Sequence, residues 1–208
     1  MKHLFLATTA AVAVLSLAAC NKPATPEAAT TDTATNTTPV GAAIDKAQDA
    51  TGAAVGAASA STVGSHDTAA FVSNASQSDI YEVQAAEIAR TRSKTAGIKA
   101  FAKMMVADHT ATSKAMAPLA AAAGQTPADK LDQRRQGFLD NLKSASDADF
   151  DKTYINQQVA AHEEALTLLQ GYAGDGSDAG LKAAAAMTTP KVQMHLDKIK
   201  AMQASMTK

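Results

Sequence analysis

Three histidines stand at core-facing positions of three different predicted helices, where imidazole can bind a metal ion or exchange protons. They are His109, His162 and His195. Each lies in a run of apolar residues that recurs every three or four positions, the spacing by which a helix faces its partners. The runs are Ile98, Ala102, Met105, His109, Thr112, Met116 and Leu119; Ile155, Val159, His162, Leu166 and Leu169; and Leu181, Ala185, Thr188, Val192, His195, Ile199 and Met202. The chain has only five histidines, so three at such positions form a pattern.

A carboxylate of the first predicted helix can join these histidines. Glu82 lies on a stripe that also holds Phe71, Ala75, Ala86 and Ala89. Its depth along the helix is similar to that of the histidines, so the four groups are expected to meet near the middle of a bundle. We predict one transition-metal ion, Zn, Cu or Fe, since imidazole suits each of them. The predicted ligands are Glu82, His109, His162 and His195, with Glu87, Asp108 and Met105 as outer candidates.

Two other interpretations of the same residues stay open. Imidazoles bonded to a carboxylate or hydroxyl can form a purely structural network that fixes helix register. Alternatively, the adjacent Asp108 and His109 are the acid and base of a hydrolase or oxidoreductase. No nucleophile motif, phosphate loop or His-Glu-x-x-His motif accompanies them. We therefore assign no catalytic residue.

A di-iron carboxylate site is not expected. Such a site needs Glu-x-x-His on two helices, so that both ligands project from one turn. The residues three before the histidines are Val106, Val159 and Val192.

The elements that must position the histidines are all helical, because apolar residues recur at helical spacing and strand-like alternation is nearly absent. We predict helices over about 66–92, 95–123, 126–143, 146–173 and 178–206. The expected start signals are a cap at Ser65, the pair Thr126-Pro127, and a capping box that opens at Ser146. Pro118 and Pro190 are expected to bend their helices.

The lengths of the connections predict how these helices pair. The first two long helices are joined tightly, as are the last two, so each pair is an antiparallel hairpin. The connection of about 25 residues between the hairpins contains the short helix and crosses back along the bundle. The expected fold is therefore all-α, a ferritin-like four-helix bundle with one long crossover, over residues 65–208.

The start of the chain has the features of a lipoprotein signal. Lys2 precedes an apolar stretch over 4–19 that is too short for a comfortable membrane span. The run Leu17-Ala18-Ala19-Cys20 resembles the bacterial lipobox, which implies cleavage after residue 19 and attachment of lipid, palmitate included, to Cys20. Asn21 stands where an aspartate would favour retention in the inner membrane. The expected location is the outer membrane, facing the periplasm.

Residues 20–64 are rich in Ala, Thr and Pro, and we predict a disordered tether, because so little there can be buried. Without Lys2, 18 of the 19 Lys and Arg remain against 20 Asp and Glu. The absence of a basic stripe, with only 4% aromatic residues, argues against nucleic-acid binding. The expected partner is the membrane, through the lipid. If the core network is structural, the outer helix faces would instead dock an envelope protein.

Several sequence blocks carry a resemblance to a known family. They are Phe71-Val72, Glu82-Val83, residues 101–109, Phe150-Asp151, Tyr154, Gln158-Val159, and residues 162–166 and 190–196. With these blocks the region from Phe71 to Met202 resembles the DUF4142 family, predicted ferritin-like envelope proteins of bacteria. The resemblance implies the fold and the compartment, and it places Glu82, Asp108-His109, His162 and His195 at signature positions. It supplies no activity.

Overall fold

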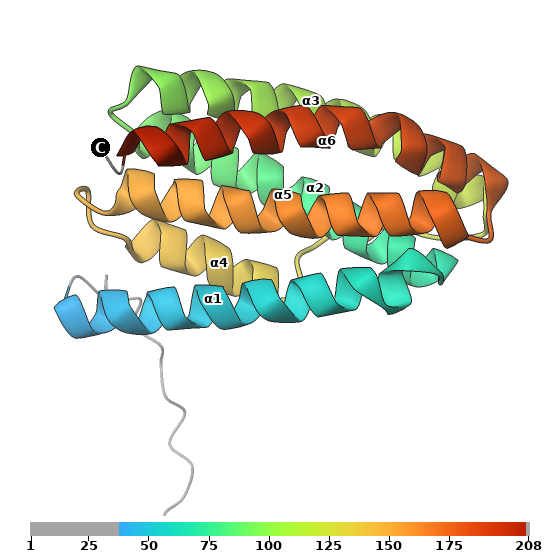
Figure 1. The fold of residues 1–208 in the computed structure, drawn as a ribbon, viewed down its shortest axis with the longest axis horizontal. Helices are drawn as coiled ribbons and strands as arrows, with labels where there is room; N and C mark the ends of the chain where they lie inside the picture. Colours follow the sequence, from blue (N-terminus) through green and yellow to red (C-terminus); the bar gives the residue numbers. More distant parts are fainter. Residues whose placement is uncertain (1–37, 207–208) are drawn as a thin grey trace, which may run out of the picture. The chain divides into compact units, whose positions relative to one another are not determined.

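The computed structural model describes residues 38–206, and every regular element within them is helical (Figure 1). In chain order the elements are α1 (Pro39–Ser61), the short 3-10 turn η1 (Val63–Ser65), α2 (Thr68–Arg92), α3 (Ala96–Ala122), α4 (Gln133–Ser144), α5 (Phe150–Asp175) and α6 (Ala179–Met206). The predicted all-α class is thus confirmed. The predicted signal peptide and Cys20 lie outside the described residues. Among the helices that are described, none is long and apolar enough to cross a membrane.

Four long helices build the core. Short turns join α2 to α3 and α5 to α6, so each pair is an antiparallel hairpin, and the two hairpins lie against each other (Figure 1). The predicted seams of α3, α5 and α6 face inward, and most of their apolar residues are buried. Aromatic contacts add to this packing, for example the stacked rings of Phe71 and Tyr172, whose centroids are 3.9 Å apart. The bundle therefore buries the faces that carry the three histidines.

The helix ends differ from expectation by a few residues. The cap of α2 is Asp67, whose Oδ1 accepts a hydrogen bond from the amide of Ala70, whereas Ser65 belongs to the 3-10 turn. The hydrogen bonds of a capping box form at Ser146, whose Oγ accepts from the amide of Asp149 and donates to the Asp149 carboxylate, but α5 begins only at Phe150, after a cap at Asp149. Pro118 and Pro190 lie inside α3 and α6, which continue beyond them.

The short crossover helix starts later than predicted. We expected it from Thr126, but α4 begins at Gln133, after a cap at Asp132. The preceding segment is held in an irregular conformation by side chains of α2. Ala128 donates its amide hydrogen bond to Ser76 Oγ, and Asp132 donates its own to Gln77 Oε1, each over 2.8 Å. These tertiary hydrogen bonds satisfy amides that a helix would otherwise use, so the local start signal is overridden.

The disordered tether predicted over 20–64 is wrong for its second half. Residues 39–61 form α1, which packs along α5 and α4 (Figure 1). Asp49 accepts hydrogen bonds from the side-chain amides of Asn141 and Gln157, over 2.8 and 2.7 Å. Ala60 is also buried. The helical domain therefore begins well before residue 65.

Two glycines explain why a helix of such small residues can pack. A Cβ at Gly52 would lie 2.7 Å from the ring of Phe138, and one at Gly56 would overlap the carboxylate of Glu164. Without side chains, these positions let the backbone of α1 approach α4 and α5 closely. Glu164 in turn holds α4 on α5, because it pairs with Arg134 and Arg135, each over 2.7 Å. The small residues that suggested disorder are thus the ones that permit close packing.

Candidate metal centre

The three seam histidines meet in one buried cluster. His109 of α3, His162 of α5 and His195 of α6 expose only 4%, 1% and 1% of their surface. Their ring centroids are 5.6–5.9 Å apart. One nitrogen of each ring lies within 4.8 Å of one nitrogen of each other ring. Three helices from both hairpins therefore contribute to one group that could hold a metal ion.

In each ring one nitrogen already has a hydrogen-bond acceptor. His109 Nδ1 donates to Oδ1 of Asp79 over 2.8 Å, and His195 Nε2 donates to Oδ2 of Asp108 over 2.9 Å. His162 Nδ1 donates to the backbone carbonyl of Gln158 over 2.8 Å. Because an acceptor requires a proton on the nitrogen that faces it, these contacts select one neutral tautomer for each ring. The lone pair then lies on the opposite nitrogen.

The three opposite nitrogens are unsatisfied. His109 Nε2, His162 Nε2 and His195 Nδ1 are buried, and nothing in the described chain forms a hydrogen bond with them. A buried polar atom without a partner costs about 1–3 kcal/mol. A bound cation would satisfy all three of these nitrogens at once.

Local electrostatics hold two of the rings neutral, the form that binds metals. Burial, together with the neighbouring histidines, lowers the pKa of His162 to about 3. Burial also lowers the pKa of His195, although Asp108 partly offsets the effect. Burial also disfavours the charged form of His109, but the hydrogen bond that His109 donates to Asp79 and the charge of Glu82 outweigh burial and raise the pKa of His109. A proton and a metal would therefore compete for His109 Nε2.

Glu82 lies beside the cluster rather than inside it. Its Oε1 is 3.6 Å from Nδ1 of His162, the nitrogen that faces Gln158, not the unpaired one. Among the described residues, the group with the geometry for a metal contains the three histidines without Glu82. Glu82 is 1% exposed, and burial raises its pKa to about 7. The structure thus places this predicted ligand next to His162 but outside the group of three histidines.

Asp108 does not pair with its neighbour in sequence. Its carboxylate faces His195 of α6 and also accepts from Lys191 Nζ over 3.1 Å. Burial favours the neutral acid, but the hydrogen bonds from His195 and Lys191 outweigh it and lower the pKa of Asp108. The acid–base pair considered for Asp108 and His109 is therefore not formed.

Sequence reasoning missed the partner of His109, which is Asp79. This residue is 7% exposed, and its second oxygen accepts from Ser113 Oγ over 2.9 Å. A signal was present, because Asp79 stands four residues after Ala75 and three before Glu82, on the same stripe of α2.

Of the other two outer candidates, Glu87 is not part of the group. Glu87 is exposed and pairs with Arg90 over 2.8 Å. Met105 is fully buried, one helical turn before His109 on the seam of α3.

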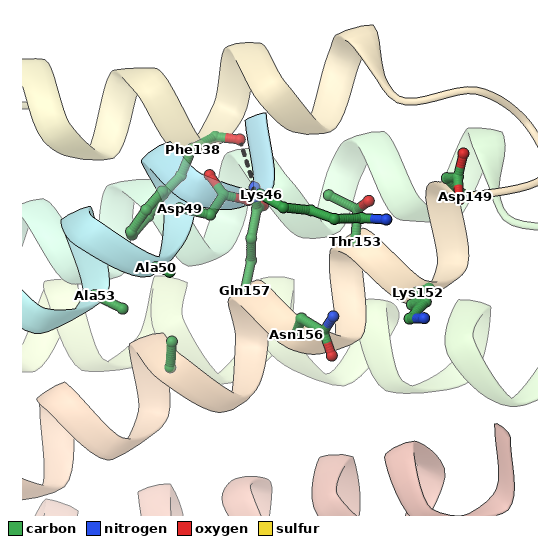
Figure 2. A pocket seen from close by; sticks show the side chains of 11 residues that line it. Lys46, Asp49, Ala50, Ala53, Phe138, Asp149, Lys152, Thr153, Asn156 and Gln157 are labelled. Atoms are coloured by element: carbon green, nitrogen blue, oxygen red, sulfur yellow. Dashed lines mark hydrogen bonds between the residues drawn. The ribbon is translucent and has the colours of Figure 1, made fainter. Parts of the chain in front are cut away.

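Away from the histidine cluster, a hollow of about 300 Å³ lies between α1 and α5 (Figure 2). Gln157 is at its centre and donates to Asp49 Oδ2 over 2.7 Å and to the carbonyl of Phe138 over 2.9 Å. Lys46 and Lys152 reach its rim (Figure 2). These central polar groups already satisfy one another, so the candidate site is the histidine cluster.

The comparisons with known proteins identify a family and nothing more specific. A family model described as "Domain of unknown function (DUF4142)" matches residues 53–202. The match starts inside α1 and covers both hairpins, with all three histidines. No curated protein and no solved structure is significantly similar to the chain.

Proposed function

The chain belongs to the DUF4142 family, for which no activity is defined, and we propose from its own geometry that the bundle binds one transition-metal ion. The proposed ligands are His109 Nε2, His162 Nε2 and His195 Nδ1. One observation carries the proposal: these three nitrogens are buried and unpaired among the described residues, in three rings that each bring one nitrogen within 4.8 Å of the others, while the opposite nitrogen of each ring has an acceptor.

The contacts behind the rings support metal binding over a purely structural network. Metal-bound histidines usually donate their other N–H to a carboxylate or backbone carbonyl, which orients the ring and makes the ligand more basic. Asp79, Asp108 and the Gln158 carbonyl do this here. A purely structural network would be expected to pair both nitrogens of each ring. In this bundle one nitrogen of each ring has no partner among the described residues.

The set of donor atoms limits which metals fit. Three neutral imidazoles suit Zn, Cu and Fe, and the general affinity order places Cu(II) above Zn(II) and Fe(II). An ion about 2.0–2.1 Å from each nitrogen sets tetrahedral ligand nitrogens about 3.4 Å apart. Nitrogens now within 4.8 Å of one another reach that spacing through small ring movements. The cluster therefore fits one ion.

The proposed location is the periplasmic face of the outer membrane, with a lipid on Cys20 as the anchor. This part of the proposal is supported by the lipobox-like run before Cys20 alone.

Metal binding can be tested on the purified mature chain by elemental analysis and by calorimetric titration with Cu(II), Zn(II) and Fe(II). We expect one ion per chain, and a loss of affinity of at least a hundredfold in His162→Ala. The matched control is His66→Ala, since His66 is exposed and remote in sequence from the seams. If none of the three ions binds the parent, or if His162→Ala binds as tightly as the parent, the proposal is wrong.

A further inference from the structure

A small cavity adjoins two of the three histidines. It has a volume of about 30 Å³ and is bordered by His109 of α3 and His195 of α6. Its remaining wall is mostly apolar, with Ala165 and Val192 among the lining residues. A space of this size holds one or two water molecules. The unpaired nitrogens His109 Nε2 and His195 Nδ1 belong to the residues that border it.

The number of protein ligands leaves a coordination position to be filled. A closed structural site usually has four protein ligands, whereas three protein ligands leave one position for water or another exogenous molecule. Within the part of the chain that is described, the group consists of three histidines only. Glu82 Oε1 is 3.6 Å from Nδ1 of His162, and its Oε2 is buried without a hydrogen-bond partner among the described residues. Among the His, Cys, Asp and Glu residues of the described chain, no fourth one belongs to the group.

A surface groove shares part of its wall with this cavity. The groove lies between α3 and α6, has a volume of about 340 Å³, and is lined partly by Leu119 and Met187. Four residues line both the groove and the cavity: Thr112, Met116, Thr188 and Lys191. Lys191 is exposed and brings a positive charge to the shared wall. The groove and the cavity are thus neighbours between these two helices.

We propose that the bound metal keeps one coordination position open toward the cavity and there binds a small inorganic anion in exchange with water. This inference rests on the proposed metal site. The anion enters through the groove between α3 and α6. Binding is a ligand exchange, in which the metal–water bond breaks, a metal–anion bond forms, and no electron is transferred.

Size and charge both favour an anion of a few atoms. A cavity of about 30 Å³ excludes organic substrates, which need several hundred cubic ångströms. The three imidazoles bind a metal in their neutral form, so the ion keeps its full positive charge in a poorly solvated core. An anion reduces that charge. Lys191 at the shared wall attracts it, against the carboxylates of Asp79, which also lines the cavity, and of Asp108, with which Lys191 pairs.

Azide is a suitable probe, because its bond to Cu(II) gives a charge-transfer absorption band. The mature chain is loaded with one equivalent of Cu(II) and titrated with sodium azide, while absorption and electron paramagnetic resonance spectra are recorded. We expect a saturable change with one azide per copper, and no azide binding to the metal-free protein.

A variant that fills the cavity, compared with a matched control, tests the route of entry. Ala165→Val adds two carbon atoms to the cavity wall from α5, and the control Ala160→Val makes the same change on α5 at the separate hollow near α1. We expect Ala165→Val to weaken azide binding at least about tenfold while Cu(II) still binds. Ala160→Val should match the parent. If Ala165→Val does not fold by circular dichroism, Ala75→Val fills the same cavity from α2.

The outcomes separate the two proposals. If none of Cu(II), Zn(II) and Fe(II) binds, both are wrong. If Cu(II) binds through the histidines but azide leaves its spectra unchanged, metal binding stands and the open position is wrong. If azide binds equally well to the parent and to the cavity-filling variant, the anion does not enter through this cavity, and the inference is again wrong.

Discussion

Nδ1 of His109 donates a hydrogen bond to Oδ1 of Asp79 over 2.8 Å, and this contact joins α3 to α2 at the centre of the bundle. Asp79 therefore acts on the candidate metal site without belonging to it. Its carboxylate selects the tautomer of His109 that leaves Nε2 unprotonated, and its charge favours a cation on that ring.

Asp79→Asn should weaken metal binding by about 10–100-fold, the usual effect of changing such a partner. The amide can still accept from His109, and its NH₂ can donate to Ser113, so the geometry is kept and only the charge is lost. Competition with a chelator of known affinity measures the change. Asp140→Asn is the control, because Asp140 is exposed on α4. Equal affinity in Asp79→Asn and the parent would show that Asp79 has no influence on the metal.

Gly56→Ala tests whether α1 belongs to the folded domain. The added Cβ would overlap the Glu164 carboxylate, so we expect a loss of about 1–3 kcal/mol in the free energy of unfolding. Gly137→Ala is the matched control in a helix, since its Cβ would meet nothing within 4 Å. That change should stabilise the protein by up to about 1 kcal/mol. Denaturant titration distinguishes the two signs, and a stabilising Gly56→Ala would mean that α1 does not pack on the bundle.

Glu82→Gln should change the pH dependence of stability in the metal-free protein. The folded-state pKa of Glu82, about 7, lies above its ordinary value of 4.5, so between these values the folded protein binds more protons than the unfolded chain. The stability that Glu82 contributes is present below about pH 4.5 and is lost as the pH rises to about 7. Relative to the parent, Glu82→Gln should therefore gain up to about 3 kcal/mol between pH 4.5 and 8.

Denaturant titrations of Glu82→Gln and the parent at several pH values, in the presence of a chelator, measure this difference. Glu163→Gln is the control, because Glu163 is half-exposed and pairs with Lys200 at the surface. A difference between Glu82→Gln and the parent that stays constant with pH would show that Glu82 is ionised throughout this range.

Replacing His109, His162 and His195 together with leucine should make the stability of the protein independent of metal. In the parent, an ion at a hundredfold its dissociation constant adds about 2.7 kcal/mol, and a chelator removes this increment. The triple variant keeps an apolar seam of similar volume and should give the same melting curve with metal or chelator. A parent whose curve moves with none of Zn(II), Cu(II) and Fe(II) would contradict metal binding and favour a structural network.

Cys20→Ser should release the protein from the membrane, because lipid is attached to the thiol of this cysteine and not to a hydroxyl. Cell fractionation followed by immunoblotting measures the change, and Asn21→Ser serves as a neighbouring control. Persistence of Cys20→Ser in the outer-membrane fraction would contradict lipid anchoring. The unfolding midpoint of the released protein should equal that of the parent.

The three histidines could be found from sequence because an inward position on a helix is a local property. A repeat of three and four residues fixes which side chains of α3, α5 and α6 share a face, whatever the partner helices are. This periodicity therefore predicted that the three histidines, His109, His162 and His195, are core residues. The tight connections within each hairpin likewise predicted which helices are neighbours.

Only the tertiary structure decided which groups touch within the core. Adjacent residues of a helix point in different directions, so Asp108 reaches His195 of α6 rather than His109 beside it. Asp79 contacts His109 across the interface between α2 and α3, while Glu82 Oε1 approaches Nδ1 of His162. Such contacts depend on how two helices are rotated and shifted along their axes relative to each other. The periodicity of a single helix predicts neither the rotation nor the shift.

The dependence on contacts between distant segments also explains why α1 and the start of α4 were not predicted from the sequence. Composition predicts whether a segment can bury enough apolar surface by itself, and residues 39–61 cannot. Their packing depends on Gly52 and Gly56 meeting Phe138 and Glu164, which are distant in sequence. The sequence by itself determined the helical class and the inward-facing histidines, because both follow from local periodicity. The tertiary structure decided the partners of those histidines, the start of α4 and the docking of α1, because each depends on contacts between distant segments.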